Sequence, residues 1–442
     1  MKTPICDFVN EYSKSGKMRL HMPGHKGNAV LGVENLDITE IDGADVLYHA
    51  HGIIRESEKN ASELFGTTKT LYSAEGSSLA IRAMIYLARL CGKKPLIAAG
   101  RNAHKVFMTA CALLDTDIAW IYPENSENII SCGITAEYLD GFLCSAEEKP
   151  SAVYITSPDY LGNVADIKGV SEVCKKHGVL LLVDNAHGAY LNFLPESMHP
   201  ISLGADICCD SAHKTLPVLT GGAYLHISKN APQSVFENAE NAMSLFASTS
   251  PSYLILQSLD KANAFLAGGY REKLADYIKE VSKLKNKLSS VGYDLIGSEP
   301  LKLTIAPKSM GYTGVGLAEI LSGNGIECEF ADPDFAVMMF TPEIGADCLE
   351  KIEKTLISVA PKEKITDSAP VVTKPEKVMT VREAVLSQSE ELDIHECCGR
   401  VLATAAVTCP PAVPIAVCGE KINESAVGCF EYYGIERIRV VK

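Results

Sequence analysis

The chain has little that would suit a nucleic-acid surface, a membrane span or an exported protein. Its 41 basic residues stand against 55 acidic ones and leave a formal net charge of −14, whereas nucleic-acid binding needs clustered Lys and Arg. No apolar stretch is long enough to cross a bilayer, and the opening MKTPICDFVNEYSKSG has no apolar run typical of a signal peptide. We therefore expect a cytoplasmic protein without a nucleic-acid or membrane partner.

The chain also lacks CxxC pairs, which supply ligands in many structural zinc sites, although it contains 15 cysteines. The adjacent pairs Cys208–Cys209 and Cys397–Cys398 allow a metal interpretation. A buried free thiol packs as a small hydrophobe, and we favour that interpretation. We expect free cysteines, a reducing compartment and no metal site.

What the chain has in quantity is apolar sequence, 47% of its residues, which is enough for a large core. From about 60 to 260, short apolar runs alternate with amphipathic segments such as Ser78–Leu90 and Lys168–His177. Strands that alternate with helices predict an α/β fold with a mainly parallel sheet, whose active site lies at the carboxyl ends of its strands. The runs expected to be strands are 95–100, 117–122, 152–158, 179–187, 205–214 and 222–227.

The pattern changes near residue 270. A charged amphipathic helix is expected over 271–292, followed by a smaller α/β unit. The segment from 361 to 379 is rich in Lys, Pro and Thr, which is typical of a linker. We therefore expect a large domain over 61–268, a small α/β domain over 269–360, a linker over 361–379 and a C-terminal domain over 380–442.

Polar residues stand where an apolar sheet would not place them without reason. Ser73–Ser78 opens the helix that runs to Leu90, and small residues there expose N–H groups that suit a phosphate. A serine N-cap is the plain structural alternative. Asp184 ends the run Leu180–Val183, where a buried carboxylate is costly without a partner such as a protonated pyridine nitrogen. A helix cap is again the alternative.

Lys214 follows another apolar strand and the residues Ser211-Ala-His213, and a Gly221–Gly222 pair comes soon after it. Burial lowers the pKa of an amine and makes it the nucleophile that Schiff-base chemistry requires. An anion loop, then an acid on a strand end, then a lysine is the order found in the large pyridoxal-phosphate superfamily. The combination predicts a pyridoxal-phosphate enzyme with Lys214 bound to the cofactor.

These motifs resemble those of the fold-type-I ornithine/lysine/arginine decarboxylases over nearly the whole chain. The length resembles the short members of that family, which lack an N-terminal wing domain. The matched segments, in order, are HMPGHKG (21–27), 37–58, GSSLAIRAMI (76–85), RNAHK (101–105), VDNAHGA (183–189), SAHKTLP (211–217) and STSPSY (248–253).

The resemblance implies a role for each matched position. Lys214 would carry pyridoxal 5'-phosphate, Asp184 would pair with the ring nitrogen and His104 would stack on the ring. The active site would lie between two subunits of a homodimer or an assembly of dimers, with residues 1–60, including His25, contributing to the dimer and the substrate site. The remaining expected cofactor contacts are Gly76, Ser77, Ser78, His187, Ser211, His213, and Thr249 and Ser250 of the neighbour.

The implied reaction is decarboxylation of a basic amino acid, arginine ahead of lysine and ornithine, as in polyamine biosynthesis. Lys214 or His213 would return the proton to Cα, and Glu420 would hold the distal cation of the substrate. The C-terminal motif departs from the family pattern over Cys409–Pro414, so the substrate is less firmly indicated than the cofactor. Two alternatives remain: an aminotransferase or lyase with the same cofactor, and a catalytically weakened regulatory paralogue.

Overall fold

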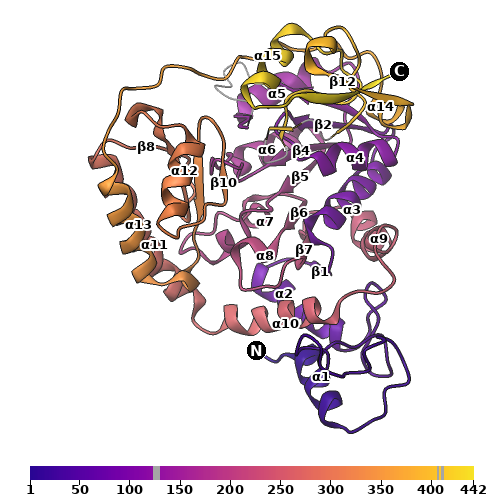
Figure 1. Ribbon diagram of the computed structural model, residues 1–442. Coiled ribbons are helices and arrows are strands. Elements are labelled where there is room, and N and C mark those ends of the chain that lie inside the picture. Colours follow the sequence, from indigo (N-terminus) through magenta and orange to yellow (C-terminus); the bar gives the residue numbers. More distant parts are fainter. Residues whose placement is uncertain (123–129, 406–407, 410–412) are drawn as a thin grey trace. The chain divides into compact units, whose positions relative to one another are not determined.

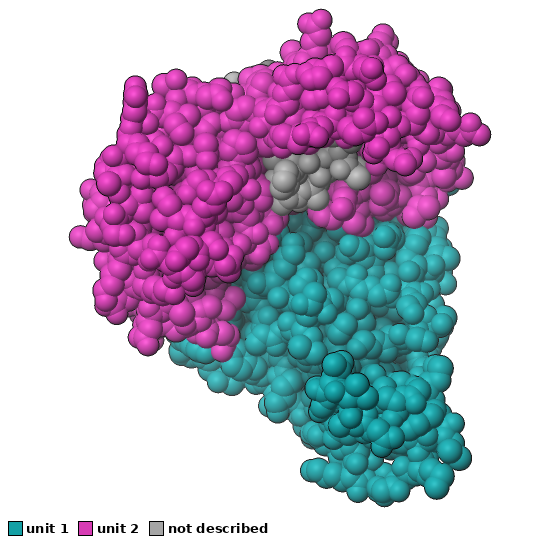
Figure 2. Space-filling view, in the orientation of Figure 1, with its two compact units in different colours: residues 1–94, 151–153, 167–273 teal, residues 95–150, 154–166, 274–442 magenta. Residues whose placement is uncertain are grey.

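The computed structural model describes residues 1–122, 130–405, 408–409 and 413–442 (Figure 1). The chain forms two compact units, shown in different colours in Figure 2. Unit 1 comprises residues 1–94, 151–153 and 167–273, and unit 2 comprises residues 95–150, 154–166 and 274–442. Within the described residues no helix combines the length and apolar character that a membrane crossing requires.

A seven-stranded sheet, in the order β1-β7-β6-β5-β4-β2-β3, is the main sheet of the fold. β5 pairs in parallel with β6 and β2 with β3, whereas β7 runs antiparallel to both β1 and β6. The helices and parallel strands confirm the predicted α/β class. The continuous apolar runs explain the strands, because a parallel strand that is covered on both faces has no polar side.

Unit 1 carries the strands in which the sequence places its acid and its lysine. Its elements are α1 (Pro4–Lys14), α2 (Ile53–Phe65), β1 (Lys69–Ser73), α3 (Gly76–Cys91), α6 (Ile167–His177), β5 (Leu180–Asp184), η1 (Ala189–Phe193), α7 (Pro200–Leu203), β6 (Ile207–Asp210), α8 (Ala212–Thr215), β7 (Ala223–Ile227), α9 (Gln233–Ser244) and α10 (Tyr253–Ala267).

Unit 2 holds two strands of the main sheet and three smaller sheets, ordered β10-β11-β9-β8, β12-β15 and β13-β14. β4 (Ala152–Thr156) and α11 (Tyr270–Ser290) have residues in both units. The other elements of unit 2 are β2 (Leu96–Gly100), α4 (Lys105–Leu113), β3 (Asp117–Ile121), α5 (Ala136–Ser145), β8 (Asp294–Ile296), β9 (Lys302–Ala306), η2 (Pro307–Met310), α12 (Gly314–Gly323), β10 (Phe330–Ala331), β11 (Ala336–Met339), η3 (Pro342–Ile344), α13 (Ala346–Ser358), α14 (Val381–Leu386), β12 (Ser389–Asp393), η4 (Ile394–Glu396), β13 (Thr408–Cys409), β14 (Val413–Pro414), α15 (Glu424–Tyr432) and β15 (Arg437–Val441).

All six expected strands are present, but two of the apolar runs are only partly strand. The run 179–187 is β5 followed by a turn, and the run 205–214 is β6 followed by the short helix α8. In both runs the strand ends at an aspartate, which is Asp184 in the first run and Asp210 in the second. Each strand therefore ends in a carboxylate, and the residues after it are available to form a site.

Candidate active site

Lys214 lies in α8, directly after the end of β6. Its backbone N–H donates to the carbonyl oxygen of Ser211 at 3.0 Å, which closes the first turn of this helix. Its Nζ lies 2.9 Å from Nε2 of His187, which belongs to the turn after β5. This contact is made either by an amine N–H that donates to Nε2 or by an Nε2–H that donates to a neutral amine, according to the tautomer of the His187 ring. The structure thus brings together two residues that the sequence predicted for one site.

Asp184 ends β5 opposite Cys209 of β6 in the parallel register. The residue is 3% exposed, and its Oδ1 accepts from the Ala186 N–H at 3.2 Å and from Cys209 Sγ at 3.5 Å. Burial and the Asp184 carboxylate raise the pKa of the Cys209 thiol well above its ordinary value, so this group remains a neutral donor. The Ala186 contact also confirms part of the cap interpretation, because Asp184 does stabilise the turn that follows it.

The start of α3 is formed by Gly76, Ser77 and Ser78, three of the predicted phosphate contacts. Gly76 has φ +69°, a conformation that favours glycine, and its N–H donates to the Gly221 carbonyl at 2.7 Å. The N-cap is Glu75, which makes no side-chain cap hydrogen bond, so the serine N-cap alternative is wrong. Ser211 Oγ donates to Ser77 Oγ at 2.8 Å, which brings the hydroxyls of two predicted phosphate contacts together.

The residues around Lys214 also carry polar groups that suit a bound ligand. Nδ1 of His213 lies 2.9 Å from the Gly222 carbonyl oxygen and therefore carries the hydrogen of that ring. The hydroxyl of Thr215 is buried and, among the described residues, has no hydrogen-bond partner. A buried polar atom without a partner is costly, and a phosphate oxygen would satisfy it. This observation supports the fit of a phosphate-bearing cofactor.

Four further predicted residues belong to unit 1, and each is at least partly exposed. Thr249 and Ser250 are exposed in the single chain, where the Ser250 N–H donates to Ser248 Oγ at 3.1 Å. Nδ1 of His25 accepts from the Gly27 N–H at 3.0 Å, so the ring presents Nε2 to Asp37 at 3.3 Å. Ser78 is half-buried in the first turn of α3.

Unit 2 contains the remaining predicted residues, His104 and Glu420. His104 is the N-cap of α4, where its Nδ1 accepts from the Val106 N–H at 3.2 Å. Glu420, 3% exposed, accepts at Oε2 from the Val417 N–H at 2.7 Å. The neighbouring motif residues 410–412 lie outside the described part of the chain.

Sequence reasoning did not identify the partner of Glu420. Arg101, the first residue of the RNAHK segment, donates from Nη2 to Glu420 Oε2 at 2.8 Å, and the Tyr122 hydroxyl donates to Oε1 at 3.3 Å. The guanidinium also lies over the rings of Trp120 and Tyr122. Burial raises the pKa of Tyr122 to about 12, so its hydroxyl remains a donor. The arginine in the matched RNAHK motif was the only sequence signal for this pair.

Together these features define a class of protein. The arrangement is that of a fold-type-I pyridoxal-phosphate enzyme. It consists of a lysine after one strand, an aspartate at the end of the adjacent parallel strand, and a helix start at which two hydroxyls meet. The residues present fit pyridoxal phosphate. Its cationic ring nitrogen suits the carboxylate of Asp184, its phosphate suits the hydroxyls, and its aldehyde suits the amine of Lys214.

The chain belongs to the ornithine/lysine/arginine decarboxylase family. The family model described as "Orn/Lys/Arg decarboxylase, major domain" matches residues 3–298, and the one for the C-terminal domain matches residues 362–437. The resemblance noted in the sequence is therefore confirmed, and the protein is a pyridoxal-phosphate-dependent amino-acid decarboxylase.

Relatives and solved structures agree with this placement. A protein of Bacillus subtilis (strain 168) named arginine decarboxylase is 30% identical, and the alignment covers 96% of this chain and 92% of that one. An arginine decarboxylase of Halalkalibacterium halodurans is similar to the same degree, with the same coverage. The fold resembles that of the Francisella novicida lysine decarboxylase LdcF, with a TM-score of 0.81 and 17% identity over 100% of this chain and 81% of that one. A serine palmitoyltransferase of Sphingomonas wittichii shares the fold more distantly, with a TM-score of 0.56 and 20% identity over 69% of this chain and 75% of that one.

Proposed function

We propose that this decarboxylase acts on arginine, in preference to lysine and ornithine, and takes part in polyamine biosynthesis. The substrate assignment draws on the full-length relatives named arginine decarboxylase. The single observation that carries the catalytic assignment is the contact of Lys214 Nζ with His187 Nε2 at 2.9 Å, beside the strand end that holds Asp184. The contact supports the assignment, because an imidazole beside an amine can take up the proton of that amine.

The cofactor supplies an electron sink for the pair that remains when the substrate loses CO₂. In our proposal Asp184 holds the ring nitrogen in its protonated, cationic form. The phosphate would be contacted by Gly76, Ser77, Ser78, Ser211 and His213, and by Thr249 and Ser250 of a second copy of the chain. His104 would stack on the ring, and His187 would lie beside it near the substrate. Lys214 Nζ, or His213 once its Nε2 also carries a hydrogen, would return a proton to Cα.

Glu420 remains our candidate for the distal cation of the substrate, with His25 nearby from the neighbouring subunit. A substrate cation that binds to Glu420 has to compete with the hydrogen bonds that this carboxylate already accepts. Both carboxylate oxygens already accept hydrogen bonds, from Arg101 and Val417 on one oxygen and from Tyr122 on the other. A substrate guanidinium would share these oxygens or take the place of the Arg101 guanidinium, which has the same charge and shape.

We also propose that the active form is a homodimer or an assembly of dimers. The N-terminal segment between α1 and α2 exposes Met18, Leu20, Val30 and Leu31, each more than 80% accessible in the single chain. An apolar cluster of this kind is stabilised when a partner covers it. The exposed Thr249 and Ser250 would then complete the site of the other subunit.

A cytoplasmic location completes the proposal. The cysteines whose side chains the structure describes are free thiols, including the buried Cys208 and Cys209. Free thiols persist in a reducing compartment.

The test of the substrate is direct. The purified protein, loaded with pyridoxal phosphate, is incubated with arginine, lysine and ornithine in separate reactions, and CO₂ and amine are measured. We expect the highest kcat/KM with arginine. Turnover of only an acidic or apolar amino acid would contradict the assignment, and an amino-group transfer to a keto acid would favour the aminotransferase alternative.

A further inference from the structure

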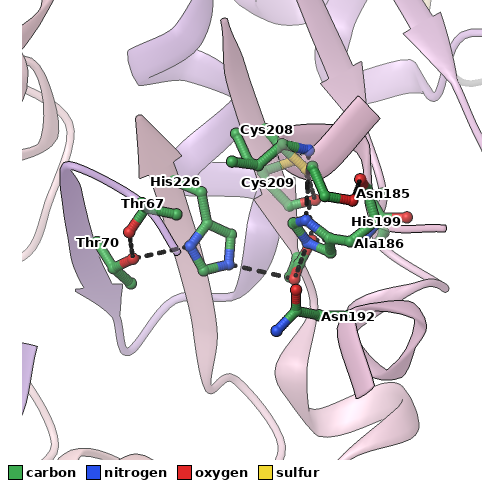
Figure 3. Close-up of polar contacts among 12 residues, drawn as sticks. Thr67, Thr70, Asn185, Ala186, Asn192, His199, Cys208, Cys209 and His226 are labelled. Atoms are coloured by element: carbon green, nitrogen blue, oxygen red, sulfur yellow. Dashed lines mark hydrogen bonds and ion pairs between the residues drawn. The ribbon is translucent and has the colours of Figure 1, made fainter. Parts of the chain in front are cut away.

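Asp210, the last residue of β6, has no exposed surface, and both of its carboxylate oxygens accept from side chains. Figure 3 labels the side chains that donate to it, those of Asn185, His199, Cys208 and His226. Oδ1 accepts from Asn185 Nδ2 at 2.8 Å and from Cys208 Sγ at 3.5 Å. Oδ2 accepts from His199 Nε2 at 3.0 Å and from His226 Nε2 at 3.2 Å. One buried carboxylate therefore joins the ends of β5 and β6 to β7 and to the start of α7.

The donors around Asp210 leave it charged. Burial by itself would raise the pKa of Asp210, but His199 and His226 hold that pKa well below its ordinary value. Nδ1 of His199 accepts from the Ile201 N–H at 3.3 Å, so this ring is neutral and carries its hydrogen on Nε2. Burial lowers the pKa of His226, whose Nδ1 lies 2.9 Å from the Thr70 hydroxyl. The cluster thus holds one fixed negative charge among neutral donors.

A metal ion explains this cluster less well than hydrogen bonding does. His199, Cys208 and Asp210 place three ligand atoms within 4.8 Å of one another. A metal needs the lone pair of His199 Nε2, however, and that atom carries the hydrogen donated to Asp210. Burial and Asp210 also raise the pKa of the Cys208 thiol well above its ordinary value, which opposes the thiolate form. The hydrogen-bonded arrangement satisfies these groups without an ion.

The cluster is connected to the candidate active site through Asn185. The Asn185 N–H donates to the Cys209 carbonyl at 3.0 Å while its amide reaches Asp210, so the residue after Asp184 is held at both ends. Gly188 closes this turn, and a Cβ at Gly188 would lie 2.0 Å from Asn185 Oδ1. The hydrogen bond between Asn185 and Asp210 therefore fixes the turn 184–188. This turn contains His187, which contacts Lys214.

We propose that Asp210 is a positioning residue for the decarboxylase reaction, resting on the proposed roles of Asp184 and Lys214. Its carboxylate fixes the turn that bears Asp184 and His187, and it stands four residues before Lys214 in the chain. A buried ion pair or carboxylate network gives little stability compared with apolar packing, so orientation is the better account of its presence here. Its negative charge also favours the protonated forms of the cofactor ring and of the linkage to Lys214.

The test compares Asp210→Asn with Asp206→Asn in the purified, cofactor-loaded enzyme. Asp206 is a matched control because it is also buried, precedes β6 at its opposite end and accepts from the Leu181 N–H at 2.8 Å. The pKa of the cofactor–lysine linkage is read from the pH dependence of the visible absorption. We expect Asp210→Asn to lower that pKa by about 0.5 unit or more. We also expect kcat to fall about 10-fold or more with little change in KM, and Asp206→Asn to leave both unchanged.

A second pair of variants tests the same proposal if Asp210→Asn does not fold. His226→Gln keeps a side-chain N–H near the position of Nε2, whereas His226→Phe removes it. We expect the Phe variant to shift the linkage pKa in the same direction as the loss of Asp210, and the Gln variant to remain close to the wild type.

Equal linkage pKa values and equal kcat in Asp210→Asn, Asp206→Asn and the wild type would overturn the inference alone. Equal values in His226→Phe and His226→Gln would overturn it as well. A wild-type protein that forms no covalent linkage at Lys214 would instead overturn the proposed function, and this inference with it.

Discussion

The acidic residues that end β5 and β6 have different surroundings, and the difference separates two roles. Side chains donate to both carboxylate oxygens of Asp210, whereas Asp184 Oδ1 accepts from the Ala186 N–H and the Cys209 thiol. In our proposal the Asp184 carboxylate pairs with the cationic ring nitrogen of the cofactor. We therefore propose orientation of the turn as the role of Asp210 and cofactor binding as the role of Asp184.

Glu420 is tested by its conversion to glutamine. If the carboxylate binds the distal cation of arginine equally in the ground and transition states, Glu420→Gln raises KM far more than it lowers kcat. The charge-assisted contact is worth about 1.5–3 kcal/mol, which corresponds to roughly a 10- to 100-fold change in KM. Glu424→Gln is the control, because Glu424 is exposed in the first turn of α15.

A fall in kcat at constant KM would contradict substrate binding by Glu420. That result would indicate that Glu420 instead positions Arg101 and the RNAHK segment through the 2.8 Å contact between Arg101 Nη2 and Glu420 Oε2.

Glu58 makes the stability of the protein depend on pH. The residue is 2% exposed in α2, and burial raises its pKa from 4.5 to about 8, although the Tyr72 N–H bonds to its Oε1 at 3.1 Å. A raised acid pKa means that the folded state binds the proton more tightly than the unfolded state. Stability is therefore fully present below about pH 4.5 and declines up to about pH 8, by about 1.4 kcal/mol per pH unit.

The measurement is the thermal unfolding midpoint between pH 5 and 8. Glu58→Gln keeps an oxygen for the Tyr72 N–H and removes the ionisation, so its midpoint should fall less steeply with pH than that of the wild type. Glu63→Gln, an exposed change in the same helix, should retain the wild-type slope. Parallel curves for all three proteins would show that Glu58 titrates normally.

At the scale of elements, the sequence predicted the strands better than the turns between them. β5 and β6 lie within continuous apolar runs, which predicted the strands, but both predicted runs extended beyond the aspartates at which the strands end. The four-residue helix α8 was not predicted, because so short a helix has no periodicity to detect. β1 was not expected either, because its buried Lys69 and Thr70 interrupt the apolar pattern.

The candidate site was predicted in part for the same reason. Lys214, Asp184 and the start of α3 lie in contiguous motifs, so one stretch of sequence identifies each. The partners of Asp210 lie 11 and 16 residues away on separate elements, and Arg101 and Glu420 are 319 residues apart. Only the fold brings such residues together, and no local pattern in a single sequence reports them.

The start of α2 depends on one carboxylate. Asp45 has φ +67° and accepts from the backbone N–H groups of His51, Gly52 and Ile54 at 2.9, 2.8 and 3.1 Å. These groups include N–H donors at a helix start, which have no intrahelical partner. We expect Asp45→Ala to destabilise the protein by about 1–2 kcal/mol, measured as a lower unfolding midpoint.

Asp45→Asn should lie between the wild type and the alanine variant, because asparagine tolerates positive φ and retains one acceptor oxygen. Asp42→Ala, an exposed change three residues earlier, serves as the control. An Asp45→Ala midpoint equal to that of Asp42→Ala would remove Asp45 from the stability of α2.

For the whole molecule, the proposed dimer predicts a linkage between assembly and activity. Leu20 and Leu31 are 83% and 87% exposed in the single chain, in the segment expected to be shared between subunits. Leu20→Asp combined with Leu31→Asp should shift the protein toward monomer in light scattering and lower kcat/KM together with it. Leu386→Asp, at an exposed apolar position of unit 2, should change neither. A monomeric double variant with full activity would contradict a shared active site.

The central claim is that Lys214 binds pyridoxal phosphate, and one measurement tests it most directly. The cofactor-loaded protein is reduced with borohydride, digested and mapped by mass spectrometry, with Lys214→Ala as the matched control. The account predicts a phosphopyridoxyl group on the peptide that contains Lys214, whose Nζ lies 2.9 Å from His187 Nε2. It predicts no labelled peptide in the variant. A label on another lysine, or no label after reconstitution with the cofactor, would contradict it.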